Sequence, residues 1–361
     1  MKREISYYFG RDELYAVIFG GRGSEHAVSR MGAENFISVA QRLGFDILPI
    51  FIGKSGEFYV YLGSAADIEC GFCEEDSSVL YPTYPVRLFG RSGFFACGSV
   101  ISVVGAVPLL HGDFGEDGVV QGALETAGIK YVGADTVSGA LMRDKAYAKS
   151  VALRLGVPTL PWLDFQKKDV DISGINEVVA EVARRLGYPV FVKPCRLGSS
   201  VGASLARTGG ELFSSIELAF SVSDRIMAER ALLSKRELEC AYFDVGSTQV
   251  ISEPGEVDLG GGFYDYRRKY LDTGSVKLIP KADIPACVGA EIKQYTKRLA
   301  GAFGARHLAR FDYFLTDGGE VYFNETNSFP GMTRASLYAA MLGESGISFE
   351  SFVKRLLTEA W

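Results

Sequence analysis

Four polar side chains occupy a predicted hairpin over residues 310–327. Arg310 and Asp312 belong to its first strand, and Glu325 and Asn327 belong to its second. With a Gly-Gly turn between the strands, Asp312 is expected roughly opposite Glu325, and residues two apart share one face of a sheet. Two carboxylates and an amide oxygen on one face form a set of oxygen ligands suited to Mg²⁺. A solvated sheet edge is the alternative, but like charges that face one another without a cation are unfavourable, so we favour a metal site.

A lysine and a run of small residues indicate a phosphate site. Lys193 follows the apolar strand Val190-Phe191-Val192 and precedes the segment Gly198-Ser199-Ser200-Val201-Gly202. Small residues let backbone N–H groups approach phosphate oxygens, and a lysine at a strand end supplies a positive charge. Taken alone, these residues fit an ordinary hairpin with an exposed lysine equally well.

Two further loops follow apolar runs, at the place where α/β sheets present their ligands. His111 lies in the loop 111–118 and is one of only three histidines in the chain. Glu25 lies in the turn 20–29 between a strand and a helix. His111 could bind a ligand or be satisfied by the loop backbone. Glu25 could hold a substrate ammonium or merely complement the helix dipole.

The common nucleotide-binding loops do not match. Gly53-Lys54-Ser55 resembles the end of a P-loop, but Leu48 occupies the position of the first glycine, which must curl the backbone around phosphate. Gly21-Arg22-Gly23 begins a dinucleotide fingerprint, but His26 replaces the third glycine. The failed fingerprint disfavours a dehydrogenase.

Bulk composition excludes several classes of protein. The net charge of −6 and the absence of a basic arm argue against a general nucleic-acid binder. The longest apolar runs, such as 100–110, are too short to span a membrane, and the N-terminus lacks the apolar core of a signal peptide. Six cysteines in 361 residues do not form a disulfide framework. Cys70 and Cys73 are interpreted as two unrelated thiols rather than a metal or redox pair. We therefore expect a soluble cytoplasmic protein.

The chain is long enough for two or three domains that would position these groups. Residues 1–133 alternate strand, loop and helix and predict an α/β domain, although 64–99 shows no clear pattern. Residues 134–245 predict a small α+β domain, and residues 246–361 predict a second one. Strands are expected at 15–19, 45–52, 102–110, 189–193, 201–206, 225–229, 237–244 and 249–259, and helices at 25–43, 119–127, 137–155, 211–220 and 286–303.

Five segments, in order and spacing, resemble D-alanine–D-alanine ligases. The resemblance runs from about residue 14 to 356. It implies a three-domain ATP-grasp fold, ATP as a substrate, two Mg²⁺ ions for which Mn²⁺ can substitute, and a homodimer. Any one segment is weak evidence, whereas five in order are highly specific. The segments are IFGGRGSEHAVS, LLHGDFGEDGVVQGALETAGIKYVG, VKPCRLGSSVG, GGFYDYRRKY and RFDYFLTDGGEVYFNETNSFPGMT.

The resemblance implies roles at an amino-acid end of the site. Glu25 would bind the ammonium of the first D-alanine, and His111 would lie beside its carboxylate. Arg310 and the backbone N–H of Gly331 would form an oxyanion site. Ser199 and Tyr270 would complete the catalytic set, and Ser336 and Leu337 would line the second amino-acid subsite.

It also implies roles at a nucleotide end. Lys145 and Lys193 would contact the ATP phosphates, and Lys269 would reach the γ-phosphate from a mobile loop over 260–275. Glu229 and Glu237 would hold the adenine and ribose. The loop over the phosphates would contain Ser199 and Ser200, and the Mg²⁺ ligands would be Asp312, Glu325 and Asn327.

Three features depart from the family pattern. Leu197 replaces an acidic residue of some members, Arg143 occupies a usually apolar position, and 231–236 needs one inserted residue, which weakens the adenine assignment.

The resemblance implies ATP-dependent ligation of two D-alanines through an acyl phosphate, for peptidoglycan precursors. Tyr270 and Leu337 favour D-alanine as the second substrate. A ligase that adds D-serine or D-lactate is the near alternative, and a catalytically silent ATP-binding regulator is the distant one.

Overall fold

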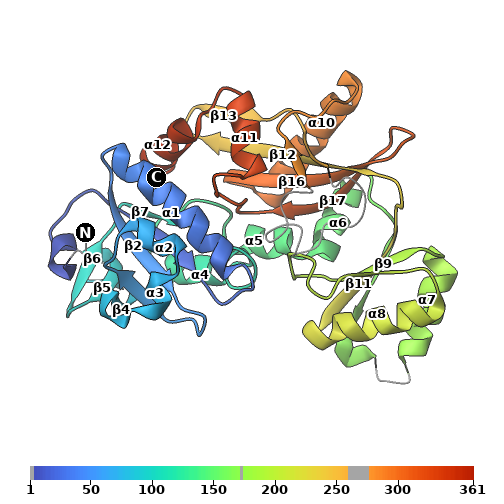
Figure 1. Cartoon of the computed structure of the whole chain (residues 1–361), viewed down its shortest axis with the longest axis horizontal. Helices are drawn as coiled ribbons and strands as arrows, with labels where there is room; N and C mark the ends of the chain where they lie inside the picture. The colour runs from blue at the N-terminus through green and yellow to red at the C-terminus, as the bar shows by residue number, and fades with distance from the viewer. Residues whose placement is uncertain (1–3, 171–173, 259–275) are drawn as a thin grey trace.

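The computed structural model describes residues 4–170, 174–258 and 276–361. In these ranges the strands form three sheets, of seven, four and six strands. In Figure 1 the first sheet lies at the left, the four-stranded sheet at the lower right, and the third sheet above and between them. The predicted arrangement of one α/β unit and two α+β units is therefore confirmed.

The first sheet has the order β6-β5-β4-β3-β2-β1-β7, and strand β1, which lies next to the edge strand β7, runs parallel to both its neighbours. Every residue of β1 is buried, as expected for a parallel strand covered on both faces. Val17 and Phe19 pack toward α1, and Ala16 and Ile18 pack toward α4. Its elements are η1 (Ile5–Tyr8), β1 (Leu14–Gly20), α1 (His26–Arg42), β2 (Asp46–Ile52), β3 (Phe58–Tyr61), α2 (Ala65–Glu69), α3 (Phe72–Glu75), η2 (Ser77–Val79), β4 (Leu80–Leu88), β5 (Arg91–Ala96), β6 (Ser99–Ser102), β7 (Gly105–Pro108) and α4 (Val119–Thr126).

Two predictions for this region are corrected. Residues 64–99 contain two short helices and the antiparallel strands β4 and β5, which the sequence pattern did not reveal because much of β4 is exposed. The single strand expected over 102–110 is two strands. β6 pairs with β5 and β7 pairs with β1, so the chain changes its partner between them.

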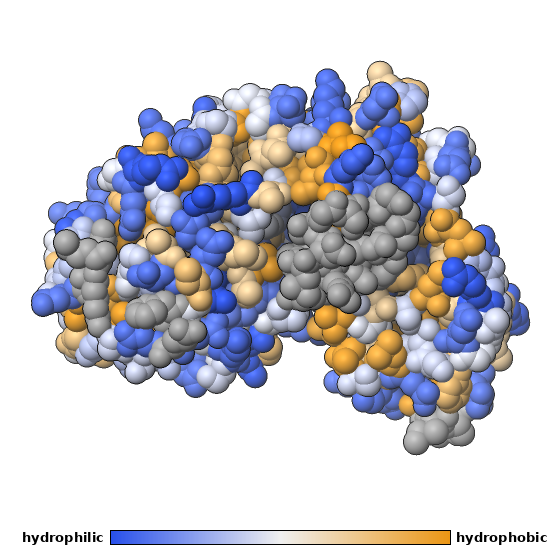
Figure 2. Space-filling model, viewed as in Figure 1, coloured by the Kyte–Doolittle hydropathy of each residue, from blue (hydrophilic) through white to orange (hydrophobic). Residues whose placement is uncertain are grey.

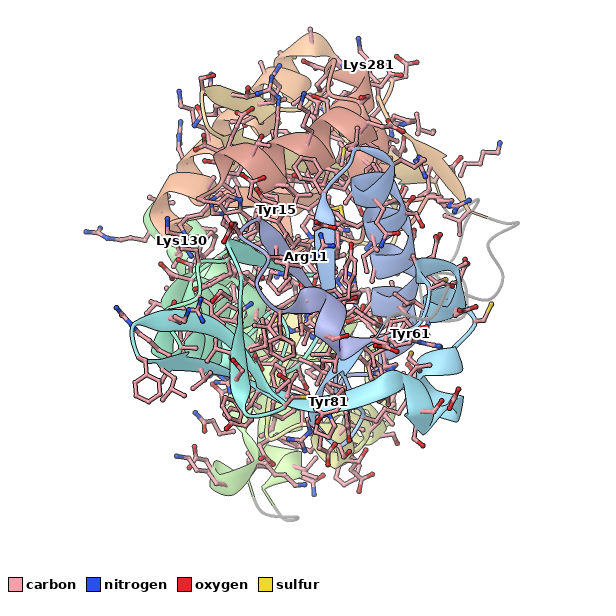
Figure 3. The ribbon with its side chains drawn as sticks, turned by 90° about the vertical axis from the view of Figure 1, so that its left-hand side faces the viewer. Arg11, Tyr15, Tyr61, Tyr81, Lys130 and Lys281 are labelled. Atoms are coloured by element: carbon pink, nitrogen blue, oxygen red, sulfur yellow. The ribbon has the colours of Figure 1, made fainter. Side chains whose placement is uncertain are left out.

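The N-terminal segment is tied to the first sheet. Tyr8 is 2% exposed and joins the core formed with α4. Arg11 stacks on the ring of Tyr7 and pairs with Asp46 at the start of β2. Figure 3 shows Arg11 and Tyr15 on this side of the molecule. The segment before β1 therefore contributes to the fold of the first unit.

The second sheet has the order β10-β9-β11-β8 and is antiparallel. Helices α7 and α8 pack on it through a core that includes Val182, Val192 and Ile216 (Figure 1). Ser199 and Ser200 both have positive φ angles, so the chain turns there and β10 begins later than predicted. Its elements are β8 (Trp162–Gln166), η3 (Lys167–Asp169), α7 (Ile175–Leu186), β9 (Val190–Pro194), β10 (Ser204–Ala206), α8 (Gly209–Val222) and β11 (Arg225–Arg230).

The third sheet has the path β15-β14-β12-β16-β17, and β13 also pairs with β12. Alternation along β12 separates two cores. Leu238 and Cys240 face α5, α6 and α10, whereas Ala241 and Phe243 face α11, α12 and the core of the first unit. Its elements are α5 (Thr136–Arg143), α6 (Lys145–Arg154), β12 (Arg236–Val245), β13 (Thr248–Ile251), β14 (Gly255–Asp258), β15 (Lys277–Ile279), α10 (Ala286–Phe303), β16 (His307–Leu315), β17 (Val321–Asn327), α11 (Leu337–Glu344) and α12 (Phe349–Glu359).

Two more predicted elements are corrected. The helix expected over 137–155 is divided at Asp144, which is extended at ψ 109° and caps α6 by accepting from the backbone N–H groups of Ala146 and Tyr147. The strand expected over 249–259 is divided between β13 and β14. Strand β12 lies in the range predicted for the central domain but pairs within the third sheet. The domain limits at 133 and 245 remain predictions.

No helix in the described ranges is both long and apolar enough to cross a membrane. Figure 2 shows hydrophilic residues distributed over the visible face, with smaller apolar areas between them.

Candidate active site

Two adjoining pockets have volumes of about 730 and 800 Å³. The first lies between the first unit, the third sheet and the loop from β9 to β10, and the second lies between the second and third sheets. Lys145, Ser199 and Glu325 line both, so the pockets form one cleft. Of the predicted residues, the first pocket is lined by Glu25, His111, Lys145, Ser199, Glu237, Arg310, Asp312, Glu325, Asn327, Gly331, Ser336 and Leu337, and the second by Lys145, Lys193, Ser199, Ser200, Glu229, Glu237 and Glu325. Tyr270 and Lys269, and the loop that contains them, lie outside the described residues.

The closing hairpin has the register that its alternation predicts. Asp312 pairs with Glu325, and Arg310 pairs with Asn327. The register shifts after Asp312, which leaves Asn324 as an extra residue of β17. Bulges of this kind often re-aim a side chain next to an active site, and here the Asn324 side chain accepts a hydrogen bond from Lys193 Nζ at 3.1 Å.

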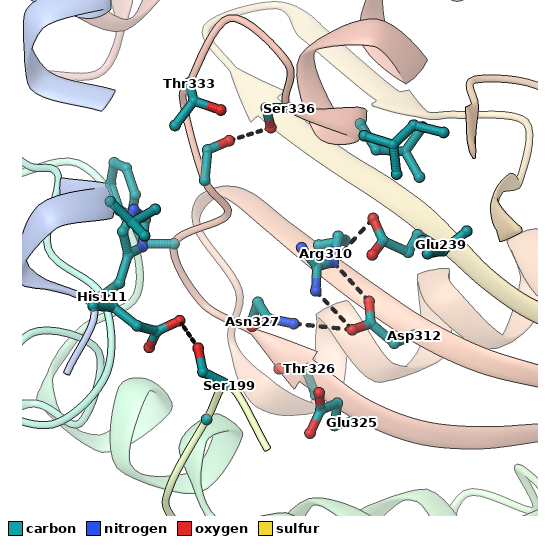
Figure 4. A pocket seen from close by; sticks show the side chains of 18 of the residues that line it. His111, Ser199, Glu239, Arg310, Asp312, Glu325, Thr326, Asn327, Thr333 and Ser336 are labelled. Atoms are coloured by element: carbon teal, nitrogen blue, oxygen red, sulfur yellow. Dashed lines mark hydrogen bonds and ion pairs between the residues drawn. The ribbon is translucent and has the colours of Figure 1, made fainter. Parts of the chain in front are cut away.

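The carboxylates of this hairpin face cations of the chain itself. Arg310 donates from Nε and Nη2 to the two oxygens of Asp312, at 2.7 and 2.8 Å. Asn327 Nδ2 lies 3.1 Å from Asp312 Oδ2, and Lys145 Nζ lies 3.2 Å from Glu325 Oε2. Figure 4 shows Arg310, Asp312 and Asn327 turned toward one another. The hairpin therefore places negative charges in the cleft, and cationic side chains of the protein lie beside them.

The oxygen donors of the hairpin suit Mg²⁺. Asp312, Glu325 and Asn327 offer carboxylate and amide oxygens, which suit a hard divalent cation. No group of three or more His, Cys, Asp or Glu side chains in the described ranges is placed to hold a metal ion, so the third donor here would have to be the amide of Asn327. The chemistry of the residues present fits Mg²⁺ on that basis.

A further carboxylate, which was not predicted from the sequence, lies beside this set. Glu239 on β12 pairs in register with Asp312, and its Oε2 lies 3.3 Å from Arg310 Nε. Glu239, Asp312 and Glu325 thus follow one another across three adjacent strands, and we refer to them as the carboxylate row. Burial acts to lower the pKa of Arg310, but Asp312 and Glu239 raise it well above its ordinary value. Glu239 could have been predicted from the alternation along β12, because it is two residues after the predicted site residue Glu237 and shares its sheet face.

Glu25 connects the first unit to the phosphate loop. It precedes α1 but makes no side-chain capping bond, and its Oε1 accepts a hydrogen bond from Ser199 Oγ at 2.7 Å. Figure 4 shows this bond beside His111. His111 is 8% exposed, and its Nε2 has no hydrogen-bond partner among the described residues. A buried ring nitrogen without a partner at the cleft is suited to contact a ligand.

A buried charge cluster lies under the phosphate end. Glu229 Oε2 is 2.9 Å from Lys193 Nζ, and its Oε1 pairs with Lys149. Lys149 is fully buried and also donates to the carbonyl of Phe323 at 3.1 Å. We call Lys149, Glu229 and Lys193 the buried triad. The Glu229 carboxylate, predicted at the adenine and ribose end, is thus engaged by two lysines in this structure.

Burial and charge act in opposite directions on the triad. Burial lowers the pKa of Lys149 to about 8, although Glu229 opposes the change. Burial also acts to lower the pKa of Lys193, but the carboxylates of Glu229 and Glu325 raise it. Lys193 therefore remains positively charged beside the cleft. Lys149 was not predicted from the sequence, although it stands four residues after Lys145 and therefore lies on the same helix face.

The loop before α11 completes the first pocket. Ser336 Oγ donates to the carbonyl of Gly331, and Leu337 is buried at the start of α11 with 5% exposure. Arg334 reaches back to Glu34 on α1 at 3.2 Å. At the end of the cleft predicted for the second amino acid, the loop before α11 of the third unit therefore contacts α1 of the first unit and closes the pocket. Away from the cleft, Cys70 and Cys73 are free thiols.

Family models match nearly the whole chain. Residues 15–134 match the model described as "D-ala D-ala ligase N-terminus", and residues 151–358 match "D-ala D-ala ligase C-terminus". Among curated relatives, the D-alanine–D-alanine ligase of Caldicellulosiruptor bescii is 36% identical, covering 96% of this chain and 94% of that one. The enzyme of the same name from Kineococcus radiotolerans is 37% identical, covering 95% of each.

Solved structures agree in fold. The VanG D-Ala:D-Ser ligase from Enterococcus faecalis has a TM-score of 0.85 and 34% identity, covering 96% of this chain and 99% of that chain. The D-alanyl-alanine synthetase A from Vibrio cholerae has a TM-score of 0.82 and 28% identity, covering 96% of this chain and 98% of that chain. The expected resemblance is confirmed: the chain belongs to the D-alanine–D-alanine ligase family, with the ATP-grasp fold of that family.

Proposed function

We propose that this protein uses ATP to join two D-alanines into D-alanyl-D-alanine. The observation that supports this best is the single cleft in which Glu25, Arg310 and the carboxylate row meet Lys145 and Lys193. Such a cleft can bind an ammonium, a carboxylate and a chain of phosphates at the same time.

The first step would activate a carboxylate, which by itself is a poor electrophile. An oxygen of the first D-alanine carboxylate attacks the γ-phosphorus of ATP, the bond to the bridging oxygen breaks, and ADP leaves. Lys193 and Lys145 would offset the charge of the phosphates. Glu25 would hold the ammonium of this substrate, since Ser199 fixes the Glu25 carboxylate at the cleft wall.

The second step would form the peptide bond. The amine of the second D-alanine attacks the carbonyl carbon of the acyl phosphate, the amine loses a proton, and phosphate leaves. Arg310 stays protonated because Asp312 and Glu239 raise its pKa against the effect of burial, so it can donate to the oxyanion. Losing one such donor typically costs roughly 10²–10³ in rate. The N–H of Gly331 would be the second donor.

Asp312, Glu325 and Asn327 would hold the magnesium, which when bound supplies charge neutralisation on the phosphates. We propose two Mg²⁺ ions, with Mn²⁺ as a substitute. Arg310 holds both oxygens of Asp312 in this structure, so the metal would share the Asp312 carboxylate with Arg310 or replace part of this contact.

The second substrate is proposed to be D-alanine. Leu337 is buried and apolar and gives a hydroxyl group no partner, so discrimination against D-serine should be modest, about a hundredfold. A D-serine-adding activity is the second candidate, because the similar VanG structure is titled a D-Ala:D-Ser ligase.

The test is mass spectrometry of the products formed from ATP, Mg²⁺ and a mixture of D-alanine, D-serine and D-lactate at pH 7.5. We expect mainly D-alanyl-D-alanine, and ADP only when D-alanine is present. If the main product joins D-alanine to D-serine or D-lactate, the assignment of D-alanine as the second substrate is wrong. ATP binding without formation of ADP would favour a catalytically silent regulator.

We further propose that the product serves as a peptidoglycan precursor, that the enzyme works in the cytoplasm, and that it forms a homodimer. Sedimentation at several concentrations tests the dimer.

A further inference from the structure

One buried cation in the cleft takes no part in the chemistry described above. Arg143 is the last residue of α5 and lines the first pocket. Its side chain is 9% exposed. The family resemblance leads us to expect an apolar residue at this position, and a buried charge needs compensation in any case.

Carboxylates surround the Arg143 guanidinium on several sides. Nη2 lies 3.5 Å from Asp113 Oδ1, and Nη1 lies 3.5 Å from Glu116 Oε2. Glu25 and Glu325 also stabilise its charge. Both measured distances exceed the 2.7–2.9 Å of a close ion pair, and no acceptor among the described residues reaches Nε. The guanidinium is therefore shared among carboxylates and not committed to one.

Two loops approach the same point between Arg143 and Glu25. A Cβ at Gly198 would lie 3.2 Å from Arg143 Nη1 and 3.3 Å from Glu25 Oε2. A Cβ at Gly112 would lie 3.0 Å from Glu25 Oε2 and 3.7 Å from Arg143 Nη2. The Glu25 carboxylate and the guanidinium thus border one narrow gap, which glycine at both positions keeps open.

The charges in this part of the cleft need compensation. Burial raises the pKa of Glu116 and of Asp113, and Arg143 acts in the opposite direction on both. Glu116 accepts hydrogen bonds from the backbone N–H groups of Gly112, at 2.7 Å, and Phe329, at 3.4 Å. Ionised Glu116 therefore ties the loop after β7 to the loop after β17, and without Arg143 it would repel Glu25.

We propose that Arg143 is a positioning residue for the first amino acid: its charge offsets the repulsion among Glu25, Asp113 and Glu116 and keeps the Glu25 carboxylate directed at the substrate ammonium. This inference rests on the proposed function. Arg143 sets the Michaelis constant for the first D-alanine and leaves the Michaelis constant for ATP nearly unchanged, because the phosphates bind at the other end of the cleft.

The test compares Arg143→Met with Arg154→Met, since both arginines end a helix and Arg154 is exposed. The two Michaelis constants for D-alanine are separated from the full dependence of rate on D-alanine concentration. We expect the first to rise about tenfold in R143M, the effect of one charge-assisted hydrogen bond. The Michaelis constant for ATP should stay within about twofold, and R154M should match the wild type.

A pH profile separates charge compensation from simple packing. Removing Arg143 raises the pKa values of the carboxylates around it, so these protonate at higher pH and the acidic limb of kcat/KM for D-alanine should move up by about one unit. The titratable groups around Arg143 are Glu25, Asp113, Glu116, Glu325, Lys145 and His111.

A second substitution sharpens the result. Adding Asp113→Asn to R143M removes one repelling charge and should recover about half of the lost affinity on a logarithmic scale, whereas D113N alone should change little. If R143M does not fold, R143K is used in its place. We expect the Michaelis constant for the first D-alanine to rise about threefold in R143K, because lysine keeps the charge but lacks the planar guanidinium that can contact two carboxylates at once. An unchanged first Michaelis constant, an unmoved acidic limb or no recovery with D113N overturns the inference. Wild-type enzyme that forms no D-alanyl-D-alanine would instead overturn the proposed function.

Discussion

The buried triad and the carboxylate row both place glutamates and aspartates against cations, but in opposite settings. In the triad, Lys149 and Glu229 are 0% and 3% exposed at their side chains, and every charge has a partner. In the row, Glu325 is 26% exposed, and Asp312 is held by Arg310 from the same strand. In the triad, Lys193 and Glu229 line the second pocket and Lys149 lies behind them, whereas all three residues of the row line the first pocket.

This difference separates permanent pairs from exchangeable ones. A buried pair is costly to break because the remaining charge has no water to replace its partner. A pair at the cleft surface, such as Glu325 with Lys145 at 26% and 9% exposure, can give up its partner to an incoming ligand at smaller cost, because the ligand replaces the lost charge. We expect the triad to determine stability and the shape of the phosphate end, and the row to exchange its cations during turnover.

Glu325→Gln should abolish dipeptide formation, with kcat reduced by at least about 10³, because one charged ligand of the proposed metal site is lost. The thermal midpoint should stay near that of the wild type, since Glu325 is partly exposed. Glu320→Gln is the matched control on the same hairpin, where the residue is exposed. Activity near normal at low Mg²⁺ and saturating ATP would remove Glu325 from the metal site.

Lys149→Met should act mainly on stability. It leaves Glu229 with one partner in place of two, and we expect a loss of about 3 kcal/mol in the free energy of unfolding. Chemical denaturation measures it, with Lys297→Met, an exposed lysine of α10, as control. A large loss of kcat in K149M under conditions where the variant stays folded would show that the triad also exchanges partners. The distinction between permanent and exchangeable pairs would then be wrong.

Glu239→Gln should lower kcat about tenfold with little change in stability. The substitution removes the charged second partner of Arg310, whose net contribution is about 1.5 kcal/mol. Steady-state kinetics together with Mg²⁺ titration of the ATP complex would show the effect. The control is Glu253→Gln, which changes an exposed pair with Lys293. Wild-type kinetics in E239Q would mean that Asp312 alone orients Arg310.

The smallest effect is expected for a surface ion pair. Glu181 and Arg185 lie 3.0 Å apart on α7, with both side chains at least 41% exposed. Glu181→Gln should change the free energy of unfolding by no more than about 0.5 kcal/mol. Urea denaturation would measure this. A cost comparable to that of K149M would mean that burial does not explain the difference between the two kinds of pair.

The order and spacing of the motifs sufficed to predict the family and the three-unit fold, and these are confirmed. Local alternation was enough to place Asp312 opposite Glu325, because side chains in a strand have a period of two. The division of the helix at Asp144 could have been predicted as well, since an aspartate before a helical run is a common N-cap. The partly exposed strand β4 could not have been predicted, because it lacks a continuous apolar run.

The sequence alone thus determined most of the long buried elements and the face of the closing hairpin that carries the polar groups, since both follow from short-range backbone geometry. Which of these groups meet depends on how the three units pack. Glu229 joins Lys149 to Lys193, and Arg143 reaches the loop of Asp113 and Glu116, because separate elements pack together there. Residues far apart in the chain have no common period that would reveal such contacts. Charge partners in the cleft therefore emerge only when the three units are assembled.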